Sequence, residues 1–212
     1  MDKFSIEYAL LSMQSALLDA ITPELRGVVI NVNKEKRLLY MRFYYDGEAS
    51  EELIDVYQCA ISESSADFGA DHVLDNGVER LDYPKVIPCN GVFAYLRKEA
   101  NFSNHISTIN VKITSIAYAL LSIQSALLGV VTPELRSVMA GFCKEKKVLS
   151  INFYYDGEVS KDLIDLWESV IAKVGLDLET GYSLDGKVER VDFPKKIHFL
   201  ERYAYLRKEA RY

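Results

Sequence analysis

The feature that most constrains this 212-residue chain is that its sequence is written twice. Tyr8-Ala-Leu-Leu-Ser returns 110 residues later at Tyr118, and the same offset holds without a gap as far as Ala100 and Ala210. About half of the aligned positions are identical. A period this long with only two copies indicates a duplicated domain, because solenoids need three or more short repeats.

The boundaries follow from where the match stops. We expect a first repeat at residues 1–100, a linker at residues 101–110 and a second repeat at residues 111–212. The linker matches neither copy and is rich in Asn, Ser and Thr, a composition typical of connecting segments. Each repeat is long enough to bury a core of its own.

Hydrophobic periodicity predicts the same six elements in each repeat. In the first, it predicts a helix over about residues 5–20 and strands around 28–32 and 39–45. Ser50 is expected to cap a second helix that runs to about residue 67, and two further strands are expected over 78–83 and 92–98. This order predicts an α+β fold of two tandem domains, each α-β-β-α-β-β, with a four-stranded antiparallel sheet and both helices on one face.

The other face of such a sheet is open to solvent or to a partner. Strand alternation places eight side chains on it: Tyr40, Arg42, Tyr44, Arg80, Asp82, Phe93, Tyr95 and Arg97. Tyr and Arg dominate binding hot spots, although aromatic residues are also favoured in strands for their own sake. The candidate partner-binding residues on this face are Tyr40, Arg42, Tyr44, Tyr95 and Arg97. Alternatively, this face or the first helix packs the two repeats into an intramolecular pseudo-dimer.

Charge is divided unevenly between the repeats. The first has 10 Lys and Arg against 17 Asp and Glu, a net charge of −7, and the second has 15 against 14, a net charge of +1. The first repeat's second helix carries a group of candidate partner-binding carboxylates: Glu48, Glu51, Glu52, Asp55 and Glu63. Glu51 and Glu63 become Lys161 and Lys173 in the second repeat. A solvated helix face explains the carboxylates equally well, while the functional interpretation is a surface for a basic partner.

Signs of catalysis are lacking in the sequence. The three histidines do not match between the repeats, and no glycine-rich loop is of the phosphate-binding kind. Cys59, Cys89 and Cys143 lack metal-ligand spacing, which favours free thiols in a reducing compartment. The sequence predicts no catalytic residue, no metal and no cofactor, and therefore a protein that is not an enzyme.

Overall charge and hydropathy exclude two further classes of partner. The net charge of −6 and the pI near 5.2 have the wrong sign for nucleic acid. The longest apolar stretch, residues 8–21, is too short and too polar to span a membrane, and the first residues do not resemble a secretory signal. We expect a cytoplasmic protein.

Several segments resemble small bacterial immunity proteins of contact-dependent growth inhibition and related polymorphic toxin systems. They include Ala9-Leu-Leu-Ser12, Thr22-Pro-Glu-Leu-Arg26, Phe43-Tyr-Tyr-Asp-Gly-Glu48 and Tyr95-Leu-Arg-Lys-Glu99, and the likeness covers both repeats. The chain departs from the usual single-domain pattern of such proteins by its tandem fusion. The resemblance implies a protein that binds and neutralises a cognate toxin domain, a nuclease with a basic cleft in our leading hypothesis. It assigns no individual residue a role.

A second function class stays open at this point. Two related domains on one chain can enclose a site between them, so the alternative is a regulatory or small-ligand binding module. A well-formed apolar pocket at the junction of the repeats would favour it.

Overall fold

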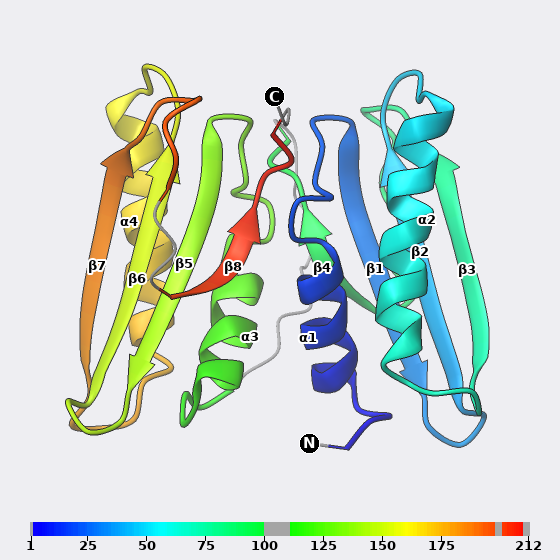
Figure 1. Cartoon of the computed structure of the whole chain (residues 1–212), viewed down its shortest axis with the longest axis horizontal. Helices are drawn as coiled ribbons and strands as arrows, with labels where there is room; N and C mark the ends of the chain where they lie inside the picture. Colours follow the sequence, from blue (N-terminus) through cyan, green and yellow to red (C-terminus); the bar gives the residue numbers. More distant parts are fainter. Residues whose placement is uncertain (1, 100–110, 198–200, 210–212) are drawn as a thin grey trace.

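The computed structural model describes residues 2–99, 111–197 and 201–209, which form two sheets with two helices each (Figure 1). The predicted linker, residues 101–110, lies outside the described residues. The first repeat contains α1 (Ile6–Ala16), β1 (Leu25–Asn33), β2 (Leu38–Tyr45), α2 (Glu51–Ala66), β3 (Val73–Arg80) and β4 (Val92–Leu96). The second contains α3 (Ile116–Leu127), β5 (Leu135–Cys143), β6 (Val148–Tyr155), α4 (Lys161–Gly175), β7 (Ser183–Arg190) and β8 (Arg202–Leu206). The predicted order of elements and the α+β class are confirmed.

Both helices of the first repeat begin at a serine cap. The Ser5 hydroxyl oxygen accepts a hydrogen bond from the Tyr8 amide, and that of Ser50 accepts one from the Leu53 amide, both at 3.2 Å. α1 is shorter than the predicted 5–20, because the chain turns at Asp19, where φ is 63°. This left-handed backbone conformation is typical of positions just beyond a helix end.

Each sheet is mixed and not antiparallel as predicted. The strand order in the first repeat is β3-β2-β1-β4, and β3 pairs with β2 in parallel from Val73 to Arg80. The cause is α2, which returns the chain along the sheet so that β3 starts at the same end as β2. β3 therefore begins at Val73 and not near residue 78. Both helices do lie on one face, as expected (Figure 1).

A β-bulge changes which side chains of β4 reach each face. Val28 pairs with Tyr95, but the next residue of β1, Val29, pairs with Phe93, so Ala94 is an extra residue. Because directly opposed residues share a face, Tyr95 joins Val28 on the helix side while Phe93 joins Val29 on the opposite side. The prediction that Tyr95 lies on the open face is therefore wrong.

The face opposite the helices is partly covered in the first repeat. Residues 81–91 fold over it and place Ile87, which is 2% exposed, in a cluster with Tyr44 and Phe93. Gly27 permits this packing, since a Cβ there would lie 2.9 Å from the Ile87 Cδ1. The second repeat has Ser137 instead, and its buried hydroxyl has no hydrogen-bond partner within the described ranges.

The two repeats meet through contacts that are matched by the 110-residue offset. The Gln14 side-chain amide donates to the Ala204 carbonyl at 3.0 Å, and the Gln124 amide donates to the Ala94 carbonyl at 2.9 Å. These carbonyls belong to β8 and β4, the central edge strands in Figure 1. Such reciprocity is the signature of a twofold interface, so the chain is an intramolecular pseudo-dimer.

Backbone hydrogen bonds reinforce the junction in two further matched pairs. The Gly129 amide donates to Leu96 at 2.9 Å, and the Asp19 amide donates to Leu206 at 3.2 Å. The remaining pair is 2.9 Å in both halves, from Lys98 to Val131 and from Lys208 to Ile21. Each sheet thus has one edge covered by the other repeat, while β3 and β7 form the outer edges.

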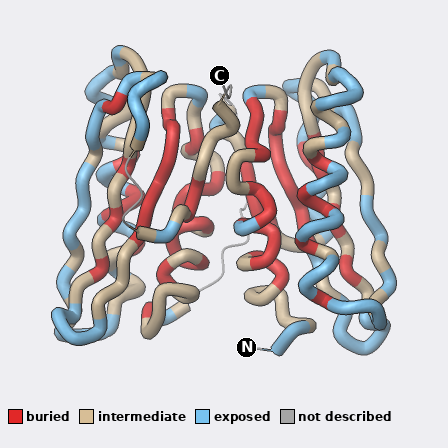
Figure 2. The backbone as a smooth tube through the Cα atoms, in the orientation of Figure 1, coloured by how far each residue is buried: buried red, intermediate tan, exposed pale blue. Residues whose placement is uncertain are grey.

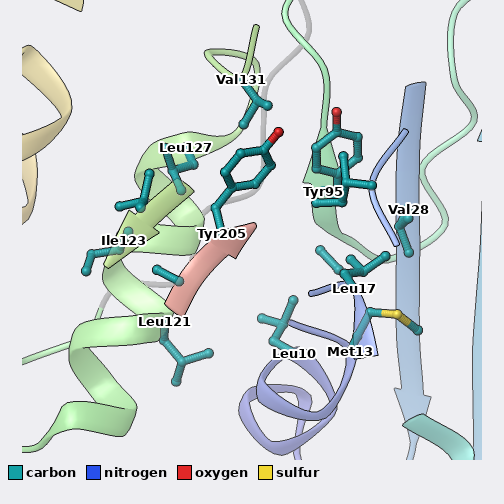
Figure 3. Close-up of a cluster of buried hydrophobic side chains, with 14 of the residues drawn as sticks. Leu10, Met13, Leu17, Val28, Tyr95, Leu121, Ile123, Leu127, Val131 and Tyr205 are labelled. Carbon is teal, nitrogen blue, oxygen red and sulfur yellow. The ribbon is translucent and has the colours of Figure 1, made fainter. Parts of the chain in front are cut away.

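One hydrophobic core runs through both repeats. Buried residues concentrate toward the middle of the molecule (Figure 2). At the junction, Leu17 and Tyr95 of the first repeat lie near Leu127 and Tyr205 of the second (Figure 3). Burial raises the pKa of both tyrosine hydroxyls well above the ordinary value. The repeats are therefore joined by an apolar contact as well as by hydrogen bonds.

Candidate partner-binding surface

Five predicted carboxylates lie exposed on α2 or just before it. Glu51 and Glu52 occupy the first turn, where they complement the positive end of the helix dipole. The opposite side of α2 buries a stripe of side chains: Tyr57, Ala60, Ile61 and Ser64. We call the exposed group the acidic helix surface; it comprises Glu48, Glu51, Glu52, Asp55 and Glu63.

The acidic helix surface extends along most of α2. Glu52 and Glu63 are separated by about three helical turns, roughly 16 Å, and point to the same side. Asp55 lies between them on that side, one turn from Glu52. A surface of this length presents several carboxylates at once to an approaching molecule.

The second repeat reproduces this surface only in part, with Glu158, Asp162 and Asp165 exposed at the positions of Glu48, Glu52 and Asp55. Lys161 and Lys173 are exposed on α4 at the positions of Glu51 and Glu63. Glu158, the counterpart of Glu48, forms an ion pair with Arg190. Arg190 also pairs with Asp192 at 2.8 Å, as Arg80 pairs with Asp82 at 3.0 Å in the first repeat. The fold is shared, but the second helix of the second repeat carries two lysines where that of the first carries two glutamates.

Tyr40 and Arg42 form a separate cluster on the face opposite the helices. The Arg42 guanidinium lies over the Tyr40 ring, with Cζ 4.7 Å from the ring centroid. The same guanidinium pairs with Asp75 at 2.6 Å and with Glu79 at 3.1 Å. Both residues are half-buried: Tyr40 packs against the Ile87 cluster, and the ion pairs of Arg42 direct its guanidinium toward β3.

Three other candidates are not available to a partner in the predicted way. Tyr44 is on the expected face but is buried beneath the Ile87 cluster, and this burial raises its pKa. Tyr95 is buried at the junction, as described above. Arg97 donates to the Pro23 carbonyl at 2.6 Å and pairs with Asp46 at 3.0 Å, so it holds the chain together locally.

A buried ion pair was missed by the sequence reasoning. Arg26, at a bulge in β1, donates twice to Glu99, with Nε and one terminal nitrogen each 2.6 Å from a carboxylate oxygen. It also donates to the carbonyls of Leu81 and Lys85. The pair therefore anchors the segment that follows β3 as well as the end of the repeat.

The second repeat contains the equivalent pair. Arg136 and Glu209 form two hydrogen bonds of 2.5 and 2.7 Å, and Arg136 lowers the pKa of the Glu209 carboxyl. The available signal was the identity of both partners in the two copies, at a fixed separation of 73 residues. The sequence near each arginine does not predict which acidic residue it pairs with.

The apolar cavity at the junction of the repeats is too small for a ligand. It lies between Gln14, Tyr95, Gln124 and Tyr205 and has a volume of about 30 Å³. That is space for roughly one or two water molecules, whereas small-molecule sites usually measure about 300 Å³ or more. Two larger hollows, of about 540 and 650 Å³, also have residues of both repeats in their lining, but they are open to solvent and partly lined by charged side chains such as Glu7, Lys112 and Arg136. The well-formed apolar pocket that would favour the alternative function is therefore not found at the junction among the described residues.

Within residues 2–99, 111–197 and 201–209, no group of three or more His, Cys, Asp or Glu side chains is placed to hold a metal ion. In the same part of the chain, no helix has both the length and the apolar character needed to cross a bilayer.

Comparison with known families decides the relationship of the chain. The family model of the MafI2 immunity protein matches it twice, over residues 7–99 and 117–209. The chain belongs to the MafI2 immunity protein family. The two matches keep the 110-residue offset, which confirms a tandem duplicate of an immunity protein. No curated protein matches the chain.

Membership of the MafI2 family refines the resemblance noted from the sequence. The family description names immunity and therefore implies a toxin partner. It does not name contact-dependent growth inhibition, so that narrower assignment stays a prediction. Each matched range contains the second helix of its repeat, α2 or α4, and the outer edge strand, β3 or β7. The two repeats therefore differ in charge on elements that both belong to the family match.

Proposed function

We propose that this MafI2 tandem protein neutralises a cognate toxin domain by binding it, with the acidic helix surface of the first repeat as the point of first contact. The family match in both repeats is the observation that carries the immunity function. The exposed carboxylates on α2 support a basic partner, because complementary charge steers encounter and rejects partners of the wrong sign. The protein acts by binding and not by catalysis.

A nuclease is the toxin class that best fits this surface. Enzymes that bind nucleic acid present basic clefts to the phosphate backbone, and an acidic surface is the natural complement of such a cleft. The three free cysteines support action in the reducing cytoplasm, where such a toxin meets its substrate. An interface of about 800 Å² on each partner is enough for specific binding.

The test uses the full chain and the toxin domain encoded beside its gene, made catalytically inactive. Affinity is measured by calorimetry at low and at physiological salt. We expect Glu48→Lys/Glu52→Lys/Asp55→Lys to weaken binding at least about tenfold at low salt and to reduce its salt dependence. The matched control reverses the equivalent positions of the second repeat, as Glu158→Lys/Asp162→Lys/Asp165→Lys.

The control should leave affinity within about twofold of the unmodified chain. Equal weakening by both variants would rule out a special role for the first repeat. If the unmodified chain does not bind the toxin domain at all, the proposed neutralisation by direct contact is wrong.

A further inference from the structure

The outer edge of the first repeat's sheet presents unpaired backbone groups. β3 pairs with β2 along all eight of its residues, Val73–Arg80. The amides of Val73 and Leu81 donate to the carbonyls of Arg37 and Tyr45, so odd-numbered residues point their backbone groups inward. Alternation then directs the amides and carbonyls of Leu74, Asn76, Val78 and Arg80 away from the sheet. No strand of the described chain covers them.

The opposite edge of the same sheet is protected. There the Ala94 and Leu96 carbonyls of β4 accept hydrogen bonds from Gln124 and Gly129 of the second repeat. An exposed strand edge is a template for pairing with another chain, and proteins usually blunt such edges. The two edges of this sheet therefore differ, because β4 is covered by the second repeat and β3 is exposed.

The second repeat blunts its outer edge in a way that the first does not. Lys187 projects from the middle of β7, and a charged side chain on an edge strand, above all lysine, opposes strand addition. The first repeat has Gly77 at this position. The positive charge beside this part of β3 comes instead from Arg42 on β2, whose Cδ and Nε lie 3.3 Å from the position that a Cβ at Gly77 would occupy. Arg42 is thus folded inward over β3.

Two partly exposed carboxylates lie along the β3 edge. Asp75 and Glu79 share the single Arg42 guanidinium, and their side chains remain 50% and 54% exposed. Val73, 59% exposed, adds an apolar side chain at the start of the strand, where β7 has Ser183. Because α2 packs on β3, this edge adjoins the acidic helix surface (Figure 1).

We propose that β3 binds an extended, basic segment of the toxin, which adds to the sheet as a fifth strand. This inference rests on the proposed function and deepens it. Backbone hydrogen bonds to the even-numbered residues of β3 supply affinity that is independent of sequence. Lys or Arg at alternate positions of the added strand meets Asp75 and Glu79, and cross-strand pairs of opposite charge are favourable.

The test measures amide hydrogen exchange in the full chain with and without the inactivated toxin domain. We expect the amides of Leu74, Asn76, Val78 and Arg80 to exchange at least about tenfold more slowly in the complex. The equivalent amides of β7 serve as the internal control and should not change. Protection on α2 with none on β3 would overturn strand addition while leaving the proposed function intact.

A proline variant provides the second arm. Asn76→Pro removes an outward amide without breaking the ladder to β2, since proline is tolerated on an edge strand when its nitrogen faces solvent. We expect it to weaken toxin binding at least about tenfold, whereas Asn76→Thr, which keeps the amide, stays within about twofold. Circular dichroism verifies that both variants are folded.

Equal affinity for Asn76→Pro and the unmodified chain would contradict strand addition. Absence of toxin binding by the unmodified chain would overturn the proposed function and this inference together.

Discussion

The two repeats share one fold but differ in how well their buried polar groups are paired. In the first, the hydroxyls of Thr22 and Tyr57 form a hydrogen bond of 2.6 Å. In the second, Trp167 replaces the tyrosine, and both Thr132 Oγ1 and Trp167 Nε1 lack a partner among the described residues. Yet the main junction hydrogen bonds are matched between the repeats, and among the described residues the exception is a long 3.5 Å bond from Gln14 to the Leu120 carbonyl. The contacts that join the repeats have persisted while internal pairs and outer charges diverged.

The junction and the outer surfaces of the chain are under different constraints. The junction is self-complementary, so a change on one side disturbs contacts in both halves. The outer surfaces have no such constraint, and there the first repeat is acidic while the second carries Lys161, Lys173 and Lys187. We infer that the second repeat chiefly completes the fold and that the first meets the partner.

The largest expected effect comes from the buried ion pairs. Arg26→Ala removes the bidentate partner of the Glu99 carboxylate, which is only 5% exposed and keeps a single longer contact of 3.3 Å to Arg97, and should lower the free energy of unfolding by about 3–5 kcal/mol. Arg136→Ala should cost less, because the Glu209 side chain is 23% exposed and can be hydrated. Urea unfolding of both variants makes the comparison. Equal losses of unfolding free energy in the two variants would mean that the burial of the carboxylate does not determine the cost.

Removal of a junction glutamine is expected to have the next largest effect. Gln14→Ala and Gln124→Ala each leave a buried edge-strand carbonyl unpaired, at a cost of about 1–3 kcal/mol. Trp167, the single tryptophan, lies in the second repeat, so its fluorescence reports the unfolding of that repeat. Gln14→Ala, in the first repeat, should shift the tryptophan transition together with the circular dichroism signal. A tryptophan transition that does not move would show that the repeats unfold separately.

A smaller effect should distinguish the two threonines. Thr22→Val leaves the Tyr57 hydroxyl, whose pKa burial raises to about 12, without its hydrogen bond and should destabilise the chain by about 1 kcal/mol. Thr132→Val removes a hydroxyl that already lacks a partner and should be neutral or stabilising. Thermal unfolding compares them, and a similar loss in both would argue that the Thr22–Tyr57 bond contributes nothing.

The smallest effect at neutral pH is expected from the junction tyrosines. Burial raises the pKa of Tyr95 and Tyr205 above that of the unfolded chain, so the folded state favours their neutral forms. Their contribution to stability is fully present below the unfolded pKa of about 10 and is lost as the pH rises above it. Tyr95→Phe/Tyr205→Phe should lose less stability between pH 9 and 11 than the unmodified chain, by urea unfolding. Identical alkaline profiles would contradict this role.

Local sequence patterns predicted the elements well but not their pairing. Ser50, the apolar stripe of α2 and the exposed carboxylates all depend on helical periodicity, which is a local property. The parallel pairing of β3 depends instead on where α2 returns the chain, and the orientation of Tyr95 depends on one extra residue at Ala94. Neither is visible in the alternation of a single strand.

The candidate site was predicted with the same limits. The carboxylates were found because charge on a helix face is read from spacing, whereas Tyr44, Tyr95 and Arg97 were assigned by a regular alternation that the bulge and the 81–91 segment interrupt. The Arg26–Glu99 pair joins residues 73 positions apart, so only the folded chain shows it. Residues whose role is set by distant contacts lay beyond sequence reasoning.

The most direct test exchanges charge between the repeats and compares a chain whose net charge is altered with one that keeps the net charge of −6. One chain carries Glu51→Lys and Glu63→Lys, and a second chain carries these together with Lys161→Glu and Lys173→Glu. Affinity for the inactivated toxin domain is measured for both at low salt. The account predicts that both chains bind at least about tenfold more weakly than the unmodified protein, because position decides the encounter. Full affinity in the chain with four substitutions would contradict it, since net charge alone would then suffice.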